Sequence, residues 1–237
     1  MIRYLYANTV DKFIKDVISG DYVEILKHKF YLEFGYRPSQ SEINSWTGSS
    51  KALLSLVKGL GNIYIVAEMS LPYSSSRVDY IIFGNKRDGK EAAILIEMKG
   101  WTDAKQSFSD DYVRVNIGQG WEDVLHPSVQ VKGYVEYLKD ILSFARQIDM
   151  KGVSYTYNAH IDYLYDSRFS EVLNRYPLFD INTRDRLRNL ISDINYGSGE
   201  EVFSKFINSK IAPQKGLIEE LEKVLKSKNL TLFVDRF

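Results

Sequence analysis

The sequence predicts a mixed α/β domain in which helices surround a mixed central sheet. Apolar residues recur at helical spacing before residue 60, and three segments rich in β-forming residues follow between residues 63 and 98. A helix and a further strand are expected after residue 127. The predicted order of elements in this middle part is α-β-β-β-α-β, with extra helices at both ends of the chain.

Two helical segments are expected before the first strand. Residues 9–34 carry apolar side chains at helical spacing, and Gly35 interrupts this pattern. Ser39 or Ser41 can then cap a second helix that extends to about Leu60.

Three strands are predicted in succession, over residues 63–69, 78–83 and 92–98. The third is an almost continuous apolar run, which is typical of a central strand that is covered on both faces. Residues 100–127 are polar and irregular, so we expect a long loop there, either a lid over a substrate or a disordered segment.

The second half of the chain is expected to contain more helix than strand. A helix is predicted to begin at Pro127, because the fixed φ of proline suits a first helical turn, and residues 153–165 read as a strand. Further helices are expected at 184–194, 199–209 and 216–228. We therefore expect a core with N-terminal helices over residues 1–165. Residues 166–237 should form a mainly helical extension that packs on this core or leads to another domain.

The composition excludes several kinds of site. The chain of 237 residues contains no cysteine, which excludes disulfides, thiolate zinc sites and cysteine nucleophiles. His28, His126 and His160 are far apart and lack metal-ligand spacing. The formal net charge is zero, so a surface that binds nucleic acid would have to be local. Without a signal-peptide core or a membrane-spanning apolar run, a cytoplasmic protein with no membrane partner is expected.

Charged residues occur at the ends of the three predicted strands. Glu68 ends the first, Asp79 begins the second, and Glu97 and Lys99 end the third. Glu97 and Lys99 are two residues apart in a strand, so their side chains share a face. A carboxylate that interrupts a buried apolar run requires a partner, since an unpaired buried charge is costly. The pattern predicts that Asp79, Glu97 and Lys99 converge.

A divalent cation is a natural partner for these carboxylates. Mg²⁺ prefers oxygen ligands and retains several waters, so Asp79 and Glu97, with the Met98 carbonyl and Glu68 as further candidates, would suffice. Such an ion lowers the pKa of a bound water and polarises a phosphoryl oxygen, and Mn²⁺ can take its place. Lys99 can orient or deprotonate the attacking water, or offset negative charge in the transition state. The set predicts hydrolysis of phosphodiesters.

This pattern resembles the PD-(D/E)xK nuclease superfamily, whose members have a restriction-endonuclease-like fold. The matching residues are Asp79 and the run Glu97-Met98-Lys99, although Val78 replaces the usual proline. Gln130 and Tyr134 on the following helix are similar to the QxxxY motif of RecB-like members. The resemblance implies an α-β-β-β-α-β core and a site role for Gln130.

A broader resemblance covers nearly the whole chain. Segments 42–46, 76–79, 96–101 and 126–130 are similar to the N-terminal region of bacterial proteins that join this nuclease fold to a helicase-type P-loop ATPase. That family typically has IELKQW and HPSYQ, where this chain has IEMKGW and HPSVQ. No GxxxxGK[ST] motif is present in this sequence, so a P-loop ATPase would either lie outside it or be absent from the protein. The resemblance implies a DNA nuclease that acts in repair or in defence against foreign DNA.

Other interpretations stay open. The same fold can serve as a catalytically inactive nucleic-acid-binding or regulatory domain, and the charged set can be a structural ion pair. Glu68 can be a solvated strand end, and Glu42 can favour a helix dipole. Residues that can contact the site or simply pack are Trp46, Trp101, His126, Gln130 and Tyr134. Residues that can contact phosphates or simply lie on the surface are Arg77, Lys105, Arg114 and Lys132.

Overall fold

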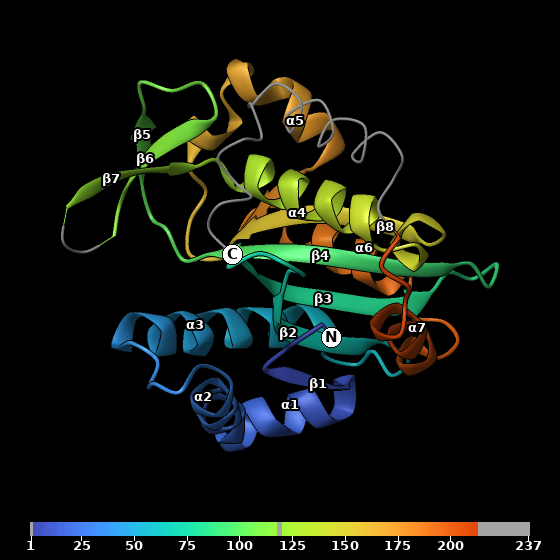
Figure 1. The fold of residues 1–237 in the computed structure, drawn as a ribbon. Helices are drawn as coiled ribbons and strands as arrows, with labels where there is room; N and C mark the ends of the chain where they lie inside the picture. Colours follow the sequence, from blue (N-terminus) through green and yellow to red (C-terminus); the bar gives the residue numbers. More distant parts are fainter. Residues whose placement is uncertain (1, 118–119, 213–237) are drawn as a thin grey trace, which may run out of the picture.

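A six-stranded mixed sheet forms the centre of the protein in the computed structural model, which describes residues 2–117 and 120–212 (Figure 1). The strand order is β1-β2-β3-β4-β8-β9. The first four strands pair antiparallel, and β8 and β9 continue the sheet parallel to β4. The strand bounds are Tyr6–Thr9 (β1), Tyr64–Ser70 (β2), Arg77–Asn85 (β3), Glu91–Lys99 (β4), Asp149–Thr156 (β8) and Leu178–Asp180 (β9).

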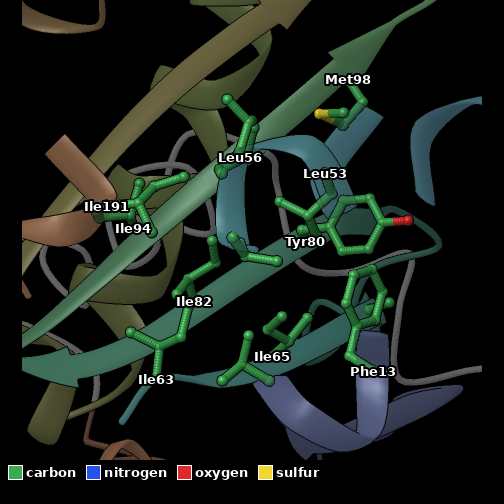
Figure 2. Close-up of a cluster of buried hydrophobic side chains, with 14 of the residues drawn as sticks. Phe13, Leu53, Leu56, Ile63, Ile65, Tyr80, Ile82, Ile94, Met98 and Ile191 are labelled. Atoms are coloured by element: carbon green, nitrogen blue, oxygen red, sulfur yellow. The ribbon is translucent and has the colours of Figure 1, made fainter. Parts of the chain in front are cut away.

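Three N-terminal helices cover one face of this sheet: α1 (Val10–Ser19), α2 (Asp21–Phe34) and α3 (Gln40–Val57). The segment expected as one helix is divided at Gly20, whose φ of 86° suits glycine and ends α1. Ser39 caps α3 through a reciprocal capping box with Glu42. Figure 2 shows Leu53 and Leu56 packing against Ile82 and Ile94 of the sheet.

The other face of the sheet is covered by α4 (Pro127–Ile141) and α7 (Gly199–Ile207). Helix α4 begins at Pro127 as predicted, and the His126 side chain accepts a hydrogen bond from the Ser128 amide. Two further helices are α5 (Ser170–Arg175) and α6 (Arg184–Ser192). The helices predicted at 184–194 and 199–209 are thus present, whereas residues 216–228 lie outside the described residues. Within the described part of the chain, no helix has the length and apolar composition needed to span a membrane.

Residues 100–127 contain a second sheet, so the prediction of a loop there was wrong for the described part of this segment. Strands β5 (Ala104–Gln106), β6 (Tyr112–Asn116) and β7 (Trp121–Leu125) pair antiparallel. Figure 1 shows this sheet beyond the end of β4, beside the first turns of α4. The sheet is stable because Val113 and Val115 bury one face against Leu164 and Phe169.

The strand predicted over residues 153–165 was also misplaced. Strand β8 begins earlier and ends at Thr156, and two short 3₁₀ helices follow, η2 (Asp162–Tyr165) and η3 (Ser167–Phe169). The aromatic residues after position 160 belong to these turns, where they pack against the second sheet. The middle of the chain therefore has the order α3, β2, β3, β4, α4, β8, with β5–β7 inserted before α4.

Candidate active site

Three carboxylates lie in one row across β2, β3 and β4. In the β2–β3 register Glu68 and Asp79 lie between the pairs Ala67–Tyr80 and Met69–Val78, and the β3–β4 register, continued by one residue, places Asp79 opposite Glu97. Residues directly opposite each other on antiparallel strands have neighbouring side chains. Lys99 is two residues beyond Glu97 on β4, so the structure brings together the residues that the sequence predicts to converge.

Glu97 is buried although it carries a carboxylate. Its side chain Oε1 accepts a hydrogen bond from Lys99 Nζ at 2.6 Å, whereas Oε2 is buried without a hydrogen-bond partner. Burial and the negative charge of Asp79 raise the pKa of Glu97 to about 7, and Lys99 and the nearby Gln130 oppose this rise. A buried acceptor without a donor costs about 1–3 kcal/mol, so the site has an unmet need for a cation or a donor.

Asp79 is held between Glu97 and the backbone of β4. Its Oδ2 accepts a hydrogen bond from the Met98 amide at 2.8 Å. Burial raises the pKa of Asp79, and the positive charge of Lys99 and the Met98 amide limit the rise. Met98, expected to offer its carbonyl to a cation, therefore also orients the Asp79 carboxylate through its amide.

Lys99 keeps its charge in this partly buried setting. Burial disfavours the charged amine, but the carboxylates of Glu97 and Asp79 outweigh burial and raise the pKa of Lys99. The ammonium also lies 5.2 Å from the ring centroid of Trp101, within cation–π range. Trp101 thus supports the position of Lys99.

Glu68 is part of the row but is already paired. Its Oε2 lies 3.1 Å from Arg77 Nε, and the Trp46 side chain donates a hydrogen bond to it. Burial and the charge of Asp79 nevertheless raise the pKa of Glu68 to about 8. Glu68 has a φ of 54°, a left-handed conformation that is uncommon for a residue with a side chain. Such strain is often found at functional sites.

Arg77 connects Glu68 to the N-terminal helices. Its Nη2 lies 2.7 Å from Oε1 of Glu42, and its guanidinium lies 5.1 and 5.4 Å from the ring centroids of Phe30 and Phe34. Arg77 is therefore a fixed counter-ion and not a free surface cation. Glu42 serves both as its partner and in the cap of α3.

Helix α4 contributes Gln130 and Tyr134 beside Glu97. Gln130 Nε2 donates a hydrogen bond to the Tyr134 hydroxyl at 2.8 Å, and the charge of Glu97 contributes to the raised pKa of Tyr134 after burial. His126 has a different position. It is fully buried, its Nε2 lies 3.0 Å from the Leu164 carbonyl oxygen, and burial lowers its pKa to about 4. We assign His126 to the anchoring of α4.

The remaining cations that the sequence suggested lie on other surfaces. Lys105 of β5 lies 3.8 Å from the ring centroid of Trp121, and Arg114 of β6 lies 3.9 Å from Asp123. Both therefore have partners within the second sheet. Lys132 lines a cavity with Arg168 on the outer side of α4.

Tyr157 is a residue beside the site that the sequence did not indicate. A Cβ added to Gly100 would lie 2.6 Å from its hydroxyl, and one added to Gly48 would lie 2.8 Å from it. Asp79 contributes to the raised pKa of Tyr157, after burial. Two glycines thus leave space for this ring, and Gly100, next to Lys99, is the sequence feature that could have pointed to it.

The donor set fits one cation with oxygen ligands. Asp79 and Glu97 are adjacent, and Glu97 Oε2 has no partner. Among residues 2–117 and 120–212, no group of three or more His, Asp or Glu side chains is arranged to hold a metal ion. Two carboxylates are enough for Mg²⁺, which keeps several waters and accepts backbone carbonyls, so the residues present fit it.

Comparisons with family models, curated proteins and solved structures gave no match to this chain.

Proposed function

We propose that the protein is a Mg²⁺-dependent nuclease that hydrolyses phosphodiester bonds, with DNA as its substrate. The observation that carries this proposal is the unpartnered Oε2 of buried Glu97, in a row with Asp79 and beside a charged Lys99. A buried carboxylate pair with a free oxygen suits a cation, and the adjacent ammonium suits a phosphate.

The order and directions of the elements support a restriction-endonuclease-like core. Helix α3 precedes three antiparallel strands, α4 packs on the sheet, and β8 returns parallel to β4. A parallel return requires a crossover, which α4 supplies. The charged row lies at the end of β4, next to α4.

Asp79 and Glu97 would hold the cation, together with the Met98 carbonyl and water. When bound, Mg²⁺ supplies an activated water and stabilises negative charge on the phosphoryl group. Lys99 donates hydrogen bonds toward the phosphate and the attacking water. The raised pKa of Lys99 keeps it charged in the cation-free protein, which suits it to offset negative charge on the phosphate.

Other residues of the site hold these groups in place. The Gln130 amide donates to the Tyr134 hydroxyl and lies close enough to Glu97 to lower its pKa. Arg77 holds Glu68 in place, so Glu68 assists by its position beside Asp79 and not as a free ligand. A P-loop ATPase as partner, and a role in repair or defence, follow from the family resemblance alone.

One observation favours a second candidate, a nucleic-acid-binding domain without catalysis. Two of the three carboxylates in the row already have a cationic partner, since Glu97 pairs with Lys99 and Glu68 pairs with Arg77. Such a domain needs no metal. It would bind nucleic acid equally well in Mg²⁺ and in EDTA.

A cleavage assay separates the two candidates. Linear, circular and single-stranded DNA and an RNA strand are incubated with the protein in Mg²⁺, Mn²⁺ or EDTA. We expect cleavage in either metal, none in EDTA, and loss of cleavage in Glu97→Gln. Glu91→Gln is the matched control, because Glu91 begins the same strand and pairs with Lys205 on the surface. Binding without cleavage of any substrate in either metal would refute the nuclease proposal.

A further inference from the structure

A second cluster of ionisable side chains surrounds His160, outside the row of carboxylates. His160 Nδ1 lies 2.5 Å from Asp180 Oδ2, and its Nε2 lies 2.9 Å from Asp162 Oδ1. The imidazole stacks on Tyr165, with ring centroids 5.1 Å apart. The ring is therefore held on one edge and one face, and its other edge is turned toward an exposed side chain.

Asp180 is the fixed part of this cluster. It is 1% exposed, and its Oδ2 also accepts a hydrogen bond from the Tyr165 hydroxyl. Its Oδ1 accepts from the amides of Asn182 and Thr183 and from the Thr183 hydroxyl. A carboxylate with five donors stays ionised and orients the imidazole so that Nδ1 carries a proton.

Asp162 is the member of this cluster whose carboxylate another anion can replace. Its side chain is 99% exposed, so the ion pair with His160 Nε2 lies in water. Exposed pairs of this kind contribute little to stability, so another anion can take the place of Asp162. The two neighbouring carboxylates also raise the pKa of His160, and the imidazolium form has both nitrogens as donors.

The cluster and the candidate active site lie at the same ends of the strands, the carboxyl ends of β4, β8 and β9. Lys99 pairs with Thr156 on β8, and Thr156 pairs with Asp180 on β9. Two strand spacings separate the backbones at Lys99 and Asp180, which amounts to about 9–10 Å. A polynucleotide whose cleaved phosphate lies at Lys99 therefore has neighbouring phosphates within reach of His160.

We propose that His160, oriented by Asp180, binds a backbone phosphate of the nucleic acid next to the phosphodiester that is cut. Asp162 occupies the phosphate position in the free protein and leaves it on binding. This inference rests on the proposed nuclease function and assigns it a contact that positions the strand. Both ring nitrogens of His160 already contact carboxylates, so neither is free to bind a metal ion in this structure.

The test measures binding of a fluorescent DNA duplex in EDTA by anisotropy, over a range of salt concentrations. His160→Gln should weaken binding about fivefold to tenfold, as expected for the loss of one charge-assisted hydrogen bond. It should also reduce the slope of log affinity against log salt by about one. Asp162→Asn should tighten binding, because it removes the competing anion. His28→Gln is the matched control, since His28 is exposed on α2.

The outcomes separate the two proposals. Wild-type affinity and salt slope in His160→Gln, in a protein whose wild type binds and cleaves DNA, would overturn the His160 contact and leave the nuclease proposal standing. Wild type that neither binds nor cleaves any nucleic acid would overturn both. Asp162→Asn keeps the test informative if His160→Gln does not fold. Unchanged or weaker binding by Asp162→Asn would contradict the proposal.

Discussion

Replacing Glu97 by glutamine should stabilise the cation-free protein at alkaline pH. Glutamine has nearly the shape of the protonated carboxyl group and removes a buried charge. The pKa of Glu97 in the folded protein is about 7, against 4.5 for the ordinary group. The folded state therefore binds this proton more tightly than the unfolded state does. Its contribution to stability is greatest below pH 4.5 and is lost as the pH rises through 7.

The size of the effect follows from the two pKa values. The difference between about 7 and 4.5 is about 2.5 units, and each unit corresponds to 1.36 kcal/mol, so wild type loses about 3 kcal/mol across this range. Glu97→Gln does not titrate and avoids that loss. We expect its free energy of unfolding relative to wild type to increase by about 3 kcal/mol between pH 4.5 and pH 8.

The measurement is urea denaturation of both proteins in EDTA at several pH values. Glu91→Gln serves as the control, because Glu91 lies on the same strand in a surface ion pair with Lys205. Its change should stay below about 1 kcal/mol at every pH. If the difference between Glu97→Gln and wild type were the same at pH 5 and pH 8, the raised pKa would be wrong and the reasoning from burial would fail.

Three other predictions concern the cation, Lys99 and the packing of the sheet. Mg²⁺ at a hundredfold excess over its Kd should stabilise wild type by about 2.7 kcal/mol in thermal denaturation, and an equal gain in Glu97→Gln would place the ion elsewhere. Lys99→Ala should slow single-turnover DNA cleavage about 10²–10⁴-fold with little change in affinity, and undiminished cleavage would remove Lys99 from the mechanism. Gly84→Ala should destabilise the protein by about 3 kcal/mol in urea, because its Cβ would lie 2.0 Å from the Ile194 carbonyl oxygen. Gly133→Ala, in an open position on α4, should instead stabilise by about 0.5–1 kcal/mol, and equal effects of the two would contradict the packing argument.

The central strands and long helices can be predicted because their apolar pattern follows directly from burial. Strand β4 is buried from Ala92 to Met98 and appears in the sequence as an apolar run. The second sheet could not be predicted in this way. Its strands have three to five residues, and β7 has no buried residue at all. Its stability depends on contacts with η2 and η3, which are distant in the sequence.

The candidate site was likewise predictable from the sequence only in part. The proximity of Asp79, Glu97 and Lys99 follows from strand order and side-chain alternation, which are local properties of the sequence. Glu68 has a left-handed backbone and pairs with Arg77, and its residue type does not predict that conformation. His160, between β8 and η2, and Asp180, the last residue of β9, are twenty residues apart and meet because β9 pairs with β8.

The arrangement of charges argues against a purely structural ion pair at the end of β4. An ion pair with Lys99 accounts for Oε1 of Glu97 but leaves Oε2 without a partner. It also does not explain why Glu68 and Asp79, both with raised pKa, lie in the same row. Neighbouring like charges on adjacent strands destabilise a sheet, and a cation at Asp79 and Glu97 removes that repulsion. The substitution that abolishes cation binding should therefore stabilise the cation-free fold, a reversal that a structural salt bridge would not produce.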